Sequence, residues 1–148
     1  MPPAKPPFNP DRVRASFARQ QVMATIGATL DAVAPGEVTI SMPPSAALTQ
    51  QHGFLHAGII ATIADSACGY AALSLMPDDA AVLSIEFKAN MLRPAEGERF
   101  IARARVIKPG RTICVTDATV HAVRNGAETL VATMTGTMMV VQGRGLSD

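Results

Sequence analysis

The chain has 148 residues, thirteen basic and twelve acidic side chains, and a formal net charge of +1. This length suits one domain with a single core, and the charge balance gives no strong field that would recruit nucleic acid or an anionic membrane. The first twenty residues lack the apolar run of a secretory signal, so we expect a cytoplasmic protein.

The N-terminal region predicts an arm, a helix and a strand. Prolines dominate residues 1–8, which we expect to form an extended arm. Asn9 and Pro10 are typical of a helix N-cap and of the first helical position, and the helix is predicted to run to about Thr25. Polar and apolar residues then alternate over 36–42, which predicts a half-buried strand.

The longest apolar stretch runs from about Ala57 to Leu75 and predicts one buried central helix. It approaches the length of a membrane span, but Asp65 and several small polar residues interrupt it, and a charge inside a membrane is costly. We therefore expect a helix in the core of a protein domain and no membrane association.

Beyond this helix the pattern changes to a period of two, which is typical of half-buried strands. In the first strand Leu83, Ile85 and Phe87 fall on one face, and Ser84 falls on the other. Three further strands are predicted over 99–108, 112–123 and 129–141.

Turn signals complete the predicted fold. Asn125 and Gly126 favour a tight hairpin between the last two strands, and Gly136, in mid-strand, predicts a bulge or a close backbone approach. We expect an α+β protein in which an antiparallel sheet wraps around one long central helix, with an extra N-terminal helix. Residues 9–141 are predicted to form a single domain, and 142–148 a flexible tail.

Asp65 is the one carboxylate in the central apolar stretch. A carboxylate buried without a partner is costly or shifts its pKa until it is neutral. One interpretation is a structural Asp that is satisfied by neighbouring hydroxyls such as Thr62 or Ser66. The other is a catalytic carboxylate, and the pattern alone leaves both open.

The start of the central helix is a second candidate position. A helix that begins near Ala57 leaves the N–H of Gly58 as an unpaired donor, which suits a carbonyl oxygen gaining negative charge. The alternative is that Gly53 and Gly58 only permit a tight loop. Gly58 and Asp65 lie about 10 Å apart along the axis, at roughly 1.5 Å per residue. They meet at one carbonyl only if two chains contribute, which predicts a composite site in a dimer.

Four segments then carry a resemblance: GFLHAG, ATIADSA, SIEFKANMLRPA and the turn KPGR. Over roughly Gly36 to Val141 the chain resembles the hotdog-fold acyl-CoA thioesterases of the PaaI-like, phenylacetic acid degradation-related family. The resemblance implies a hotdog fold and hydrolysis of an acyl-CoA thioester to a free carboxylic acid and coenzyme A, with no cofactor. It also implies homodimers, commonly joined as a dimer of dimers.

The resemblance implies roles for residues around the helix start. Asp65, nine positions after His56, acts as general base or nucleophile. The N–H of Gly58 polarises the thioester carbonyl, and His56 shapes the turn. Gln50 stands where many relatives have Asn, with the same amide on a longer arm. Ala57 replaces the middle glycine of the family's His-Gly-Gly motif and tolerates helical backbone angles.

Ser84 falls where some relatives place Ser or Thr beside the reacting centre. Strict alternation sets it opposite the face of Ile85 and Phe87, so we expect it to reach the site only near a subunit seam. An ordinary surface serine is the alternative.

Substrate contacts are expected from two groups of residues. Apolar side chains of the helix start and its preceding loop, Phe54, Leu55 and Ile59, are expected to line the acyl pocket. A nearly neutral protein needs local cations for the phosphates of coenzyme A. The candidates are Arg93, Lys108 and Arg111, although for each residue taken alone an ordinary solvated charge is the favoured interpretation.

His52 and His56 are four residues apart without a third ligand nearby, so we expect no metal site.

Two other functional classes stay open. A non-catalytic acyl-CoA-binding hotdog module would use the same pocket without turnover. A hotdog dehydratase or hydratase would place its His and carboxylate in a different motif.

Overall fold

The computed structural model describes residues 5–148, so residues 1–4 of the predicted arm lie outside the described residues. Helices and strands follow one another as α1 (Pro10–Arg19), α2 (Gln21–Ile26), β1 (Thr29–Ala34), β2 (Glu37–Met42), a 3₁₀ turn (Ala46–Leu48), α3 (Ala57–Leu73), β3 (Ala81–Met91), β4 (Arg99–Lys108), β5 (Ile113–Arg124) and β6 (Ala127–Val141).

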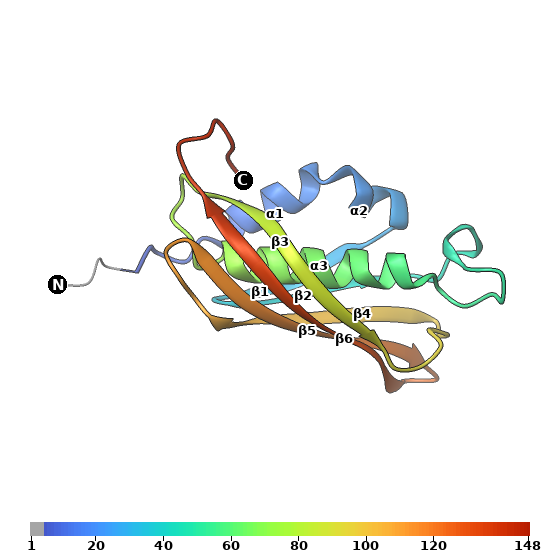
Figure 1. The fold of residues 1–148 in the computed structure, drawn as a ribbon. Helices are drawn as coiled ribbons and strands as arrows, with labels where there is room; N and C mark the ends of the chain where they lie inside the picture. The colour runs from blue at the N-terminus through green and yellow to red at the C-terminus, as the bar shows by residue number, and fades with distance from the viewer. Residues whose placement is uncertain (1–4) are drawn as a thin grey trace.

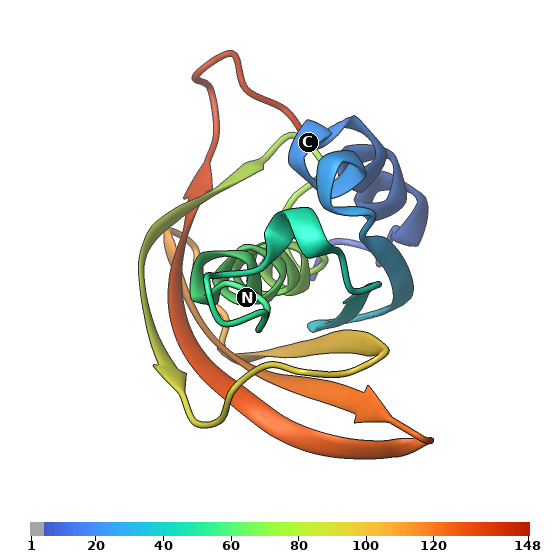
Figure 2. The ribbon, with the colours of Figure 1, turned by 90° about the vertical axis from the view of Figure 1, so that its right-hand side faces the viewer.

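The strands form one antiparallel sheet in the order β1-β2-β4-β5-β6-β3. Figure 1 shows α3 lying across this sheet, and Figure 2, along the helix, shows the sheet curling around it. α1 and α2 lie on the side of α3 that the sheet leaves open (Figure 2). The predicted α+β architecture, with a sheet around one central helix and an extra N-terminal helix, is confirmed.

α3 is buried on most of its surface because the sheet and α1 enclose it. Its bounds lie within two residues of the predicted ones. Small side chains such as Ala67, Ala71 and Ala72 are fully buried and let the strands approach closely, while Ile63 and Leu73 fill the remaining volume. Within residues 5–148 no helix combines the length and apolarity that crossing a membrane requires.

The N-terminal region differs from its prediction in two places. The expected single helix is two helices, because Gln20 adopts an extended backbone between them. The strand β1 was not predicted, since most of its residues are exposed and the pairing of β1 with β2 shifts at Asp31. That shift breaks the alternation on which a sequence-based prediction depends.

A β-bulge in the edge strand β3 changes which side chains face α3. Ser84 pairs with Met138 and Glu86 with Thr137, so Ile85 is an extra residue between them. Ser84 and Phe87 therefore lie on the same side, toward the helix. The prediction that Ser84 lies opposite the face of Phe87 is wrong, because it assumed regular pairing.

The two predicted glycine features are found. Asn125 and Gly126 both have positive φ angles, of 50° and 77°, as a tight hairpin between β5 and β6 requires. Gly136 marks a close approach: a Cβ atom there would lie 2.8 Å from Met138 Cε and 3.0 Å from Thr116 Oγ1. Both neighbours are fully buried, so neither has free space to move into.

The space around Gly136 is filled, whereas the space around Gly69 is open, so changes of these two glycines to alanine should have opposite effects on stability. Gly136→Ala should lower the free energy of unfolding by about 1–3 kcal/mol through overpacking. Gly69→Ala, in α3, should raise it by about 0.5–1 kcal/mol, because its Cβ would meet only Val82 at 4.0 Å and alanine favours the helix. Urea unfolding of both variants measures the two values, and equal effects would contradict this account of the packing.

Candidate functional site

Asp65 lies in the middle of α3 and faces the edge strand β3. Ser84 Oγ donates a hydrogen bond of 2.7 Å to Asp65 Oδ1. The hydroxyls expected to satisfy Asp65 bond elsewhere: Thr62 donates to the Gly58 carbonyl, and Ser66 to the Gln20 side chain. This contact forms within one chain, on the edge strand of the sheet, and the expected nearness of Ser84 to a subunit seam stays a prediction.

The environment of Asp65 changes its acidity. Burial raises the pKa of the Asp65 carboxyl above its ordinary value of 3.8, and the hydrogen bond from Ser84 partly opposes this. A carboxylate of this kind is a stronger base than a fully solvated one. The Asp65–Ser84 pair is therefore suited to accept a proton or to attack an electrophilic carbon.

A small cavity of about 130 Å³ begins at this pair and extends along α3. Its walls come from the helices, the edge strand and the segment after β6, through Gln20, Asp65, Ser66, Gly69, Tyr70, Val82, Ser84 and Asp148.

The start of α3 presents a different donor from the one expected. His56 is the N-cap residue, and its Nδ1 accepts the Gly58 N–H at 2.8 Å. The prediction that the Gly58 N–H is unpaired is therefore wrong. Ala57 N–H is the first-turn donor that has no acceptor within residues 5–148.

A groove of about 460 Å³ opens beside Ala57 and gathers several predicted residues. Gln50, Phe54, Leu55 and Arg93 all line it, and the other lining residues are Ala57, Ile60, Met91, Leu92, Pro94 and Ala95. Backbone hydrogen bonds hold its loop: Gln50 N–H donates to the Phe54 carbonyl at 2.9 Å, and Leu55 N–H to the Ala95 carbonyl at 3.0 Å.

Three predicted residues lie outside this groove. Ile59 is half-buried and packs against the core. Lys108 ends β4 on the surface. Arg111 lines a separate cavity of about 450 Å³ with Lys5 and Leu75, beyond the C-terminal end of α3. Arg93 thus lies at one end of the molecule, and Lys108 and Arg111 lie at the other.

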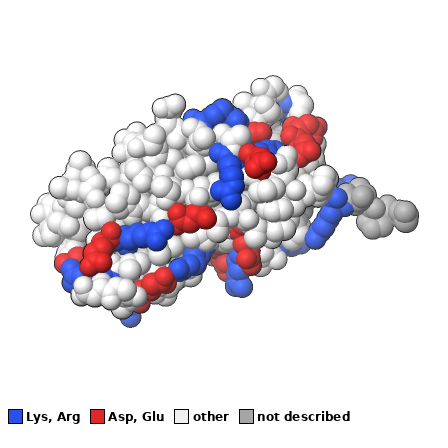
Figure 3. Space-filling view, turned by 180° about the vertical axis from the view of Figure 1, so that it is seen from behind, with Lys and Arg blue, Asp and Glu red and all other residues white. Residues whose placement is uncertain are grey.

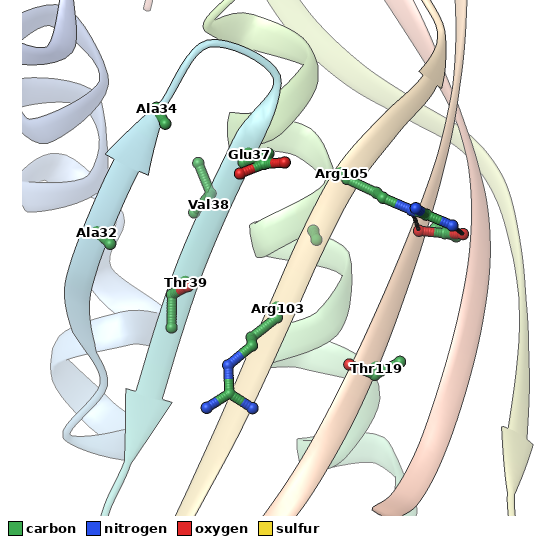
Figure 4. A pocket seen from close by; sticks show the side chains of 10 residues that line it. Ala32, Ala34, Glu37, Val38, Thr39, Arg103, Arg105 and Thr119 are labelled. Atoms are coloured by element: carbon green, nitrogen blue, oxygen red, sulfur yellow. Dashed lines mark hydrogen bonds and ion pairs between the residues drawn. The ribbon is translucent and has the colours of Figure 1, made fainter.

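The outer face of the sheet carries a further hollow of about 390 Å³, shown in Figure 4. Arg103 and Arg105 line it, but Arg103 bonds to both carboxylate oxygens of Glu128, at 2.9 and 2.7 Å, and Arg105 to Asp117. Viewed from behind, basic and acidic side chains lie next to one another (Figure 3). Asp65 faces the opposite side of the sheet, so this hollow is not part of its site.

The described residues offer no ready metal centre. Among residues 5–148, no three His, Cys, Asp or Glu side chains are grouped so that they could hold a metal ion. Cys68 and Cys114 are buried, free thiols, and burial raises the pKa of the Cys68 thiol to about 12, which leaves it unreactive at neutral pH.

Sequence reasoning missed several residues of this region. Met91 could have been found, because it ends a predicted strand just before Arg93. Gln20 enters the small cavity only because the N-terminal helix breaks there, and Asp148 only because the segment after β6 folds back. Neither has a local sequence signal.

The Asp65–Ser84 contact makes a direct prediction about acidity. Ser84→Ala removes the donor that stabilises the charged carboxylate, so the Asp65 pKa should rise above its wild-type value. Ser84→Thr keeps a hydroxyl and should leave it nearly unchanged. Carboxyl ¹³C NMR titration measures all three proteins, with Asp65→Asn to assign the resonance. An Asp65 pKa that falls in Ser84→Ala would refute the contact.

Comparisons with known proteins show which family the chain belongs to. Residues 52–129 match the family model described as the thioesterase superfamily. A protein of Halobacterium salinarum, provisionally named an esterase, is 33% identical over 67% of this chain and 68% of its own.

Two solved structures show the same arrangement of helices and strands. A thioesterase family protein from Silicibacter pomeroyi is 61% identical, over 90% of this chain and 98% of that chain, with a TM-score of 0.89. The PaaI protein of E. coli, from the phenylacetic acid degradation operon, is 22% identical over 90% and 93%, with a TM-score of 0.80, and shares the fold. The predicted hotdog fold is confirmed, and the chain belongs to the thioesterase superfamily.

Proposed function

We propose that this thioesterase hydrolyses acyl-CoA in the cytoplasm and that Asp65 is its catalytic carboxylate. The observation that carries the proposal is the half-buried Asp65, with its raised pKa and its hydrogen bond to Ser84, at the mouth of a cavity. A thioester carbonyl is already electrophilic, so one positioned carboxylate and one polarising donor suffice without a cofactor.

Two chemical routes are compatible with this carboxylate. As general base, Asp65 takes a proton from water while the oxygen bonds to the thioester carbon, and the tetrahedral intermediate expels the coenzyme A thiolate. As nucleophile, an Asp65 oxygen bonds to that carbon, the thiolate leaves, and water hydrolyses the resulting anhydride. Enzyme-derived oxygen in the acid released by a single turnover in oxygen-18 water would identify the nucleophilic route.

Ala57 N–H is the proposed donor to the thioester oxygen. It lies at the positive end of the α3 dipole and lines the groove, whereas the Gly58 N–H is already taken by His56. Gly58 and His56 would then act by positioning this donor. Gln50, on the same groove, places an amide where it can support the carbonyl or the water.

One chain cannot bring both groups to one carbonyl. Ala57 and Asp65 are eight residues apart on α3, which is about 12 Å along the axis at roughly 1.5 Å per residue. A homodimer solves this if Ala57 of one subunit approaches Asp65 of the other.

The edge strand β3 offers the surface for such a dimer. It pairs with β6 on one side, and no strand of residues 5–148 covers its other edge. An open edge with large apolar side chains favours pairing with another strand. Four large side chains on β3 are 42–52% exposed, namely Leu83, Ile85, Phe87 and Met91.

The course of β3 also fits a composite site. Ser84 contacts Asp65, and Met91, near the end of the strand, lines the groove beside Ala57. A twofold axis near Phe87 and Lys88 pairs two antiparallel β3 strands and sets the Ser84 of each opposite the Met91 of the other. Each Asp65 then faces the groove of its partner. A dimer of such dimers stays a prediction from the resemblance.

The groove is the proposed path of coenzyme A. Phe54 and Leu55 supply apolar contacts, and Arg93 is the cation at that groove. Arg93 Nη1 donates to the Leu130 carbonyl at 2.9 Å, which leaves other guanidinium donors for a phosphate. Lys108 and Arg111 lie at the end of the molecule opposite Arg93. In the proposed dimer they would therefore contact coenzyme A bound in the partner's groove.

The first test is release of free coenzyme A from aromatic and from short- to long-chain acyl-CoAs. We expect turnover by the wild type and a loss of more than about a hundredfold in kcat in Asp65→Asn, because base or nucleophile is removed. Circular dichroism and thermal unfolding establish that the variant is folded. Tight acyl-CoA binding by both proteins without turnover would contradict the proposal and indicate a binding module.

The second test removes the Ala57 donor and checks the composite site. Ala57→Pro deletes the N–H at the first helical position, where proline fits and His56 before it is already extended. We expect kcat to fall about a hundredfold or more, while Ala57→Gly keeps the donor and its activity.

Mixing inactive Asp65→Asn with inactive Ala57→Pro should restore activity. Random mixing makes half of the dimers heterodimers, each with one intact site, so about a quarter of wild-type activity should return. Heterodimers that form, as native mass spectrometry can establish, but show no activity would exclude a site shared between subunits.

A further inference from the structure

The cavity beside Asp65 has a chemistry of its own, apart from the larger groove. It starts at the Asp65–Ser84 pair and runs along α3 past Gly69. Asp65 and Gly69 are four residues apart, about 6 Å along the helix axis. A cavity of this length, with a volume of about 130 Å³, holds a chain of four or five carbons or one ring.

Its walls are polar where a pocket for an aliphatic chain would be apolar. Gln20 Oε1 lies 3.3 Å from Ser66 Oγ on one wall. On another wall are Tyr70 and Asp148, and behind them the buried Ser16 Oγ lies 3.3 Å from the Tyr70 hydroxyl oxygen and donates to Asp148 Oδ1 at 2.9 Å. A purely apolar acyl group would displace water from these groups and give them no partner in return.

Asp148 lines the cavity from a segment remote in sequence. The segment after β6 folds back, and Val82 N–H donates to Asp148 Oδ2 at 2.7 Å. Together with the bond from Ser16, this joins the carboxylate to α1 and to the edge of β3. A carboxylate has about four acceptor positions, so these two bonds leave room for a donor on a ligand.

We propose, on the basis of the proposed acyl-CoA thioesterase function, that this cavity is the acyl subsite and that Asp148 sets its specificity. It takes a short acyl group that carries a neutral hydrogen-bond donor, such as a hydroxyl, at its far end. The Asp148 carboxylate accepts that donor, and its negative charge repels an acyl group that ends in a carboxylate. Phe54 and Leu55, in the larger groove, then contact the pantetheine part of coenzyme A.

A matched series of thioesters tests this inference. Pentanoyl-CoA, its terminal hydroxy analogue and glutaryl-CoA share a five-carbon chain and differ in the terminal group, while dodecanoyl-CoA tests length. For the wild type we expect kcat/KM to be at least about tenfold higher for the hydroxy analogue than for pentanoyl-CoA, the size of one hydrogen bond. Glutaryl-CoA and dodecanoyl-CoA should be poorer still.

Variants of Asp148 separate charge from hydrogen bonding. Asp148→Asn keeps the size and an acceptor oxygen but removes the charge. We therefore expect kcat/KM for glutaryl-CoA to rise about tenfold or more, while the preference for the hydroxy analogue largely remains. Asp148→Ala removes the acceptor, so kcat/KM for the hydroxy analogue should exceed that for pentanoyl-CoA by only about threefold or less. Asp78→Asn, a neutralised Asp on the surface, is the matched control and should keep every ratio.

Ratios within one protein are insensitive to the amount that is folded, so a destabilised variant still gives an answer. Unchanged ratios in Asp148→Ala, or a wild type that prefers dodecanoyl-CoA, would overturn the specificity inference and leave the thioesterase proposal standing. If the wild type hydrolyses neither these four thioesters nor any acyl-CoA of the wider panel, both the thioesterase proposal and the specificity inference are overturned.

Discussion

The hydrogen bond from Ser84 to Asp65 is the contact around which this structure is arranged. It joins the central helix to the edge strand and holds the carboxylate at the border of the core. Burial raises the pKa of Asp65, and the Ser84 hydroxyl prevents the carboxylate from being left without any partner. The bond depends in turn on the bulge at Ile85, which turns both Ser84 and Phe87 toward α3.

This placement has a consequence for assembly. A carboxylate near the open edge of the sheet is accessible to a neighbouring molecule, whereas one facing β4 or β5 would be enclosed by its own chain. The same edge strand carries apolar side chains and passes from Asp65 to the groove beside Ala57. In the proposed dimer, one symmetric contact would both pair the two β3 strands and complete each site.

The sequence predicted regular features well and local irregularities poorly. The bounds of α3 and the Asn125-Gly126 hairpin follow from apolar periodicity and from the positive φ angles that a tight turn needs. The bulge at Ile85 has no such signal, because any residue can occupy it. Gly136 was a partial indication, since it lies on the neighbouring strand beside the shifted register.

The same distinction applies to the site. Spacing and resemblance predicted roles for Asp65, Gln50 and Arg93, and each of the three lines a cavity or groove. Which N–H group is free at the start of α3, however, depends on where the His56 side chain turns. Gln20 and Asp148 reach the cavity through chain reversals that local patterns do not encode. Long-range contacts of this kind arise from packing, which the residues on either side do not determine.

His56 also explains why the chain has Ala57 followed by glycine. A Cβ atom at position 58 would lie 3.1 Å from His56 Nδ1, so a larger residue there would push against the ring that caps the helix. At position 57 the proposed role needs only the backbone N–H, so a side chain is tolerated there, and alanine favours the helix. Glycine at position 58 thus leaves room for the His56 ring to cap the helix. Because His56 Nδ1 accepts the Gly58 N–H, the Ala57 N–H is the donor left for a ligand, and its direction is set by the first turn of α3.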